Sequence, residues 1–117
     1  MSQVSRVPTV SDLPDEIGSR FDASADIDHL PSHLHALESE HPGLFKAIVR
    51  MIDVLESEAG IRRTSVDHDE VDGLRPVTIW AESTYSPEER EAHLHRIHDM
   101  AVRTLGEYKP LVLVAVV

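Results

Sequence analysis

The sequence predicts an α/β (α+β) domain in which a small three-stranded mixed sheet packs with two helices. The first observation is residues 111–117, seven consecutive apolar residues that form a strand too apolar to face water on either side. The second is the helical spacing of apolar residues in 44–59 and 86–105. The third is the pair of strand-like segments 61–66 and 77–81 between them, which gives the order helix, strand, strand, helix, strand.

The first 30 residues differ in composition from the rest of the chain. They are mostly small, polar or acidic, so we expect 1–30 to form a mobile acidic N-terminal tail. A chain of 117 residues is the size of one ordinary domain, and 31–117 is predicted to be a single α/β domain.

A short amphipathic segment, 12–21, interrupts this tail. Leu13, Ile17 and Phe21 recur at every fourth position, as on one face of a helix. The segment is expected to dock on its own domain or on another protein, which makes these three side chains candidates for partner binding.

The first part of the domain is predicted to be helical. Ser32 is a plausible N-cap for a short helix, and Pro42 starts a new helix or kinks the existing one. The segment 44–59 then carries one wide apolar face, and Gly60 is suited to end it in the left-handed conformation.

A hairpin is predicted next, with strands 61–66 and 77–81 and an Asp72-Gly73 pair in the connection. Trp80 lies on the opposite strand face from Ile79. Trp80 therefore either packs in the core beneath the first long helix, which is the favoured interpretation, or lines a groove or interface.

The second long helix has a clear start. Ser86 is the expected N-cap, Pro87 follows at the first position, and Glu89 completes a capping box with Ser86. Its buried residues are predicted to be Leu94, Ile97, Ala101 and Leu105, and Gly106 ends it. The connection to the apolar strand should cross over right-handed, so that this strand runs parallel to 77–81.

The apolar strand predicts an assembly. If both helices pack on one face of the sheet, the other face stays bare. If one helix packs on each face, the backbone edge of the strand stays open. We therefore expect a homodimer that extends the sheet, with Trp80, Leu113, Val114 and Val116 as interface candidates.

Composition excludes several function classes. The net charge of −10 disfavours direct nucleic-acid binding and is compatible either with a basic protein partner or with a GC-rich or saline source. The absence of cysteine excludes disulfides, thiolate-bound metals and thiol catalysis. We expect no signal peptide and no membrane span, and hence a cytoplasmic protein.

The eight histidines suggest a possible metal site. On the second long helix, His95 could share an ion with Glu91, His98 or Asp99, a set that suits zinc or nickel but provides too few ligands alone. No catalytic motif and no cofactor-binding glycine motif is present, so no cofactor is expected.

Together these features predict a non-enzymatic protein-interaction or regulatory module that acts as a homodimer. The alternative is a small metal-binding protein that uses His95, His98 and Asp99.

Overall fold

A computed structural model describes residues 12–21, 29–67 and 77–117. In chain order its elements are α1 (Asp15–Gly18), α2 (Leu30–Glu40), α3 (Leu44–Glu56), β1 (Ile61–Asp67), β2 (Val77–Ser83), α4 (Pro87–Leu105), the 3₁₀ helix η3 (Gly106–Leu111) and β3 (Val112–Val116). In these ranges no helix is both long and apolar enough to cross a membrane.

The three strands form one mixed sheet in the order β1-β2-β3. β1 pairs antiparallel with β2, and β3 pairs parallel with β2 on its other side. The predicted fold class, the antiparallel pair of β1 and β2 and the parallel pair of β2 and β3 joined through α4 are therefore confirmed. The Asp72-Gly73 turn lies outside the described residues.

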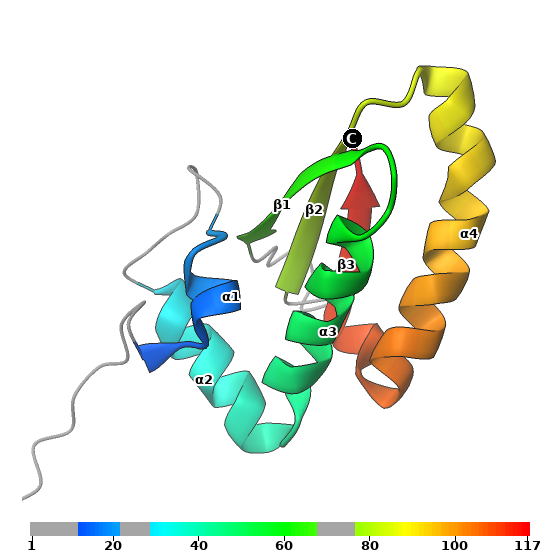
Figure 1. The fold of residues 1–117 in the computed structure, drawn as a ribbon. Coiled ribbons are helices and arrows are strands. Elements are labelled where there is room, and N and C mark those ends of the chain that lie inside the picture. The colour runs from blue at the N-terminus through cyan, green and yellow to red at the C-terminus, as the bar shows by residue number, and fades with distance from the viewer. Residues whose placement is uncertain (1–11, 22–28, 68–76) are drawn as a thin grey trace, which may run out of the picture.

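Both long helices pack on the same face of this sheet. α3 contacts β1, α4 contacts β3, and the two helices contact each other. Figure 1 shows α4 running alongside β3, with α1 and α2 beyond the opposite edge of the sheet. The apolar core between sheet and helices includes Val66, Val77, Ile79, Ala81 and Val112 from the strands and Ile48, Ile52, Ile97 and Leu105 from the helices.

The helix ends follow the local sequence. Ser86 Oγ accepts a hydrogen bond from Glu89 N, and the Glu89 carboxylate accepts one from Ser86 N, which confirms the predicted capping box. α3, however, ends at Glu56 with Ser57 as its C-cap, so the prediction that it continues to residue 59 and is ended by Gly60 was wrong. Gly60 lies in the turn before β1 with φ +96°, a conformation that favours glycine, and its Cα faces the Tyr85 ring.

Two further predictions about the helices were wrong. α2 begins at Leu30 rather than after Ser32, because Pro31 fits the first helical turn and His29 occupies the N-cap position. Leu94 was predicted to be buried but is 46% exposed. The strand after η3 also begins one residue later than predicted, since Leu111 belongs to η3.

The amphipathic segment 12–21 packs on its own domain. Leu13 and Ile17 are buried in the core, Ile17 completely, and α1 contacts α3. Phe21 forms an isolated parallel bridge with Val66, in which Arg20 O accepts a hydrogen bond from Val66 N. This bridge covers part of the outer edge of β1. The predicted mobility of the remaining tail residues concerns 1–11 and 22–28, which lie outside the described residues.

Candidate interaction surface

The face of the sheet opposite the helices is largely open. Pairing register places Trp80 beside Ala115 on this face, with Leu113 and Val117 further along. Except for the buried Thr78, the residues of this face are half-buried or exposed, and Trp80 and Val117 are exposed by 36% and 48%. The core interpretation of Trp80 is therefore wrong, because both helices cover the opposite face.

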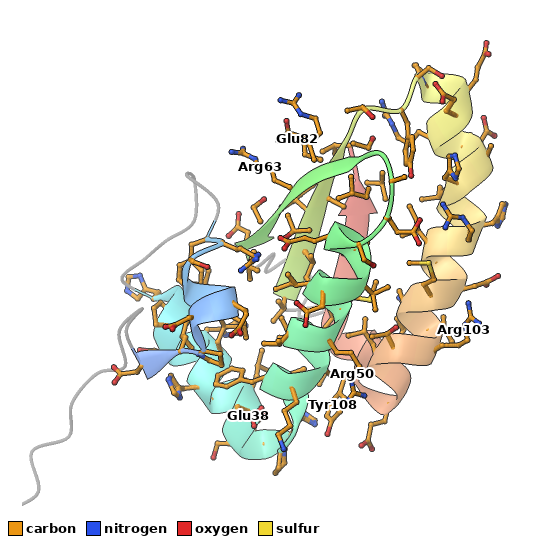
Figure 2. The ribbon with its side chains drawn as sticks, viewed as in Figure 1. Glu38, Arg50, Arg63, Glu82, Arg103 and Tyr108 are labelled. Carbon is orange, nitrogen blue, oxygen red and sulfur yellow. The ribbon has the colours of Figure 1, made fainter. Side chains whose placement is uncertain are left out.

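A polar rim borders this apolar strip on the β1 side. Arg63 Nε lies 2.9 Å from Glu82 Oε2, and Ser65 pairs with Trp80 across the strands. Figure 2 shows Arg63 and Glu82 together at this side of the sheet, away from α3 and α4. The open face thus changes from polar over β1 to apolar over β3.

The outer edge of β3 carries backbone groups that pair with no other strand of the described residues. Val117 N donates to Ala81 O, and Val117 O accepts from Ser83 N, so both backbone groups of Val117 point toward β2. Because these directions alternate along a strand, Ala115 also points toward β2, whereas Val114 and Val116 point outward. In the described part of the chain, no strand pairs with this outer edge.

α4 carries exposed apolar side chains beside this edge. Leu94 and Val102 are each 46% exposed, and with His98 they are spaced four residues apart along the helix. Leu94 and His98 line a small cavity of 40 Å³ with Leu113 and Val114. We call the outer edge of β3 together with Leu94, His98 and Val102 the β3 surface.

The predicted interface residues divide between two neighbouring parts of the molecule. Trp80 and Leu113 lie on the open face, whereas Val114 and Val116 direct half-buried side chains toward the helices and their backbones toward the free edge. The sequence reasoning missed Val102 and Ala115. The four-residue spacing of Leu94, His98 and Val102 was the available signal for the first.

The predicted metal ligands do not form a cluster. His95, His98 and Asp99 are all exposed on α4, and His93 instead stacks on Tyr85 with 4.4 Å between the ring centroids. Among residues 12–21, 29–67 and 77–117, no three histidine or acidic side chains lie close enough together to hold a metal ion. This arrangement does not favour the metal-binding alternative.

The candidates for partner binding in the N-terminal segment face inward. Leu13 and Ile17 belong to the core, and Phe21 packs against it. Their side chains hold the segment to α3 and β1, so they do not form an exposed docking surface.

A polar hollow of 480 Å³ lies beside this segment, lined in part by Arg20, Glu56 and Thr64. The Glu56 carboxylate accepts hydrogen bonds from Arg20 Nε at 2.7 Å, from Arg20 Nη2 at 2.8 Å and from Thr64 Oγ1 at 2.8 Å. The Arg20 hydrogen bonds lower the pKa of Glu56, so the carboxylate stays ionised near neutral pH. Such a group ties the N-terminal segment to α3 and is unsuited to acid–base catalysis near neutral pH.

A Glu56→Gln substitution is expected to lower the free energy of unfolding at pH 7 by about 1 kcal/mol, because it removes a partly exposed ion pair. The folded-state pKa of Glu56 lies below its unfolded value, so this stabilisation is present above the unfolded pKa and is lost as pH falls through the folded pKa. Urea denaturation at pH 7 and at pH 3 measures both effects. The exposed Glu40→Gln is the control, and an equal loss at both pH values would contradict the prediction.

No family model, no curated protein and no solved structure matches this sequence.

Proposed function

We propose that this chain is a non-enzymatic protein-interaction or regulatory module that acts as a homodimer through its β3 surface. The observation that carries the proposal is the outer edge of β3, which pairs with no strand of the described residues and whose outward backbone groups lie beside exposed apolar side chains of α4. Unpaired edges are usually covered, charged or paired with another strand. The edge residues of β3 are all apolar. A second copy would therefore both pair with its backbone hydrogen-bonding groups and bury its side chains.

The two edges of the sheet support this assignment by their contrast. Phe21 pairs with Val66 on the outer edge of β1, and the same strand carries the exposed Arg62 and Arg63 near its start. β3 has neither a covering segment among the described residues nor a charged side chain. An association that uses the sheet edge is therefore favoured at β3.

The described residues offer little support for an enzyme. The Glu56 carboxylate is already held by Arg20 and Thr64, and the helical histidines do not converge on a common point. The basic protein partner suggested by the net charge stays a prediction.

Sedimentation velocity at about 50 µM is expected to show a dimer, since this concentration exceeds ordinary dimer dissociation constants. Leu94→Glu should weaken dimerisation about ten- to hundredfold, because it removes the burial of one leucine side chain from the interface. Circular dichroism should show that the variant stays folded, since Leu94 is already 46% exposed.

Ala92→Glu is the matched control for this experiment. Ala92 is exposed on α4 and lies about 200° around the helix from Leu94, so it faces away from the β3 surface. The control should sediment like the unmodified protein. A monomeric unmodified protein, or equal effects of the two glutamates, would refute the proposed interface.

A further inference from the structure

We infer that two copies of this chain pair their β3 strands antiparallel, with the two Ala115 residues opposite each other at the two-fold axis. This inference rests on the proposed homodimer and specifies its geometry. It follows from which backbone groups of β3 are free.

The free groups can be identified one residue at a time. Val117 directs both backbone groups to β2, and by alternation Leu113 and Ala115 do the same. Val112 points outward, but its N–H already donates to Lys109 O within the last turn of η3. Within residues 12–21, 29–67 and 77–117, the outward residues whose N–H and C=O are both free are therefore Val114 and Val116.

Two-fold pairing of identical edges makes the strands antiparallel. When Val114 lies opposite the partner's Val116, each residue exchanges both of its hydrogen bonds with the other. The symmetry repeats this exchange for Val116 and the partner's Val114. All the free groups of these two residues are then satisfied, and no bond of η3 or β2 is broken.

The neighbouring register fits less well. Centring the pair on Val114 would place Val112 opposite the partner's Val116 and would require the Val112 N–H, which Lys109 O already accepts. One carbonyl in each copy would then lack its donor. The backbone therefore favours the register centred on Ala115.

Side chains agree with this register. Residues opposite each other in a non-hydrogen-bonded antiparallel pair come closest, with Cα atoms about 4.5 Å apart. Ala115, the smallest side chain of β3, occupies this crowded position on the open face, where it neighbours Trp80. The two-fold axis also keeps the helices of both copies on one side of the joined sheet, so that both copies of α4 flank the interface.

Cysteine cross-linking tests the register directly, because the full sequence contains no cysteine. Single variants Ala115→Cys, Val114→Cys and Trp80→Cys would be oxidised under the same mild conditions and followed on non-reducing gels. A Cα separation of about 4.5 Å falls within the range of natural disulfides, so Ala115→Cys is expected to form dimers at least about tenfold faster than the other two. Sedimentation velocity would be measured in parallel on the unmodified protein.

The possible results distinguish the register from the homodimer itself. Fastest cross-linking at Ala115 in a dimeric protein supports the register. Fastest cross-linking at Val114 would show the neighbouring register, and fastest cross-linking at Trp80 would show packing of the two open faces. Either result overturns our inference while the homodimer stands. A monomeric unmodified protein overturns both the inference and the proposed function.

Discussion

Ala115→Pro is expected to unfold the chain, whereas Val116→Pro should leave it folded but monomeric. The two positions are adjacent, yet the N–H of Ala115 points toward β2 and that of Val116 points to the free edge. Proline lacks the N–H group and is tolerated in sheets only at edges or bulges. At residue 115 it would break the bonding between β2 and β3 and leave a β2 carbonyl unpaired.

Ala115→Pro is expected to lower the free energy of unfolding by about 3 kcal/mol or more, which is a large part of the total stability of a domain of this size. Val116→Pro should lower the free energy of unfolding by only about 1 kcal/mol, and its main effect should be to prevent pairing with a second copy. Urea denaturation measures the first effect and sedimentation velocity the second. If both prolines destabilised the fold equally, the backbone directions that we assign to β3 would be wrong.

Ile17→Ala is expected to lower the free energy of unfolding of the whole domain by about 2–5 kcal/mol. Ile17 is completely buried, although it belongs to a helix of only four residues near the start of the described chain. The loss reflects the apolar contacts and the cavity that the truncated side chain leaves next to α3.

Asp15→Ala is the matched control for this substitution, because Asp15 is exposed on the same helix. It should change the stability by no more than about 0.5 kcal/mol. A single cooperative transition in urea, shifted only by Ile17→Ala, would show that α1 unfolds together with the sheet. If Ile17 served only to bind another protein, both substitutions would leave the midpoint unchanged.

Features that depend on a few neighbouring residues could be predicted from the sequence. The capping box needs only the spacing of Ser86 and Glu89. The parallel pairing of β2 and β3 follows from their order in the chain, because the helix between two strands returns the chain to the end of the sheet at which the first strand began. The start of α2 was missed because Ser32 is a good N-cap in isolation, while Pro31 also fits the first turn of a longer helix.

The sequence could not predict which face of the sheet and which side of α4 other elements cover. Alternation along β2 shows that Trp80 and Ile79 face opposite ways, but it does not show which face the helices cover. Leu94 has the spacing of a buried residue, yet it lies in one row along α4 with the exposed His98 and Val102. This row borders the outer edge of β3, where no further strand of the described residues covers it.

The candidate surface could be predicted only in part. The apolar run identified β3 as the strand that needs further cover, and Leu113, Val114 and Val116 all lie on it. The sequence could not assign these residues to the open face or to the edge, because that requires the hydrogen bonds of Val117.

The Phe21–Val66 bridge would limit the size of the proposed assembly. A sheet with two accepting edges can add copies without limit and grow into a fibril, whereas this sheet has one edge partly closed by its own chain. Growth through β3 alone uses the same edge of both copies and stops after a single addition. By covering part of the β1 edge, the short segment from α1 to Phe21 would therefore prevent a dimer joined through β3 from adding further copies and forming a polymer.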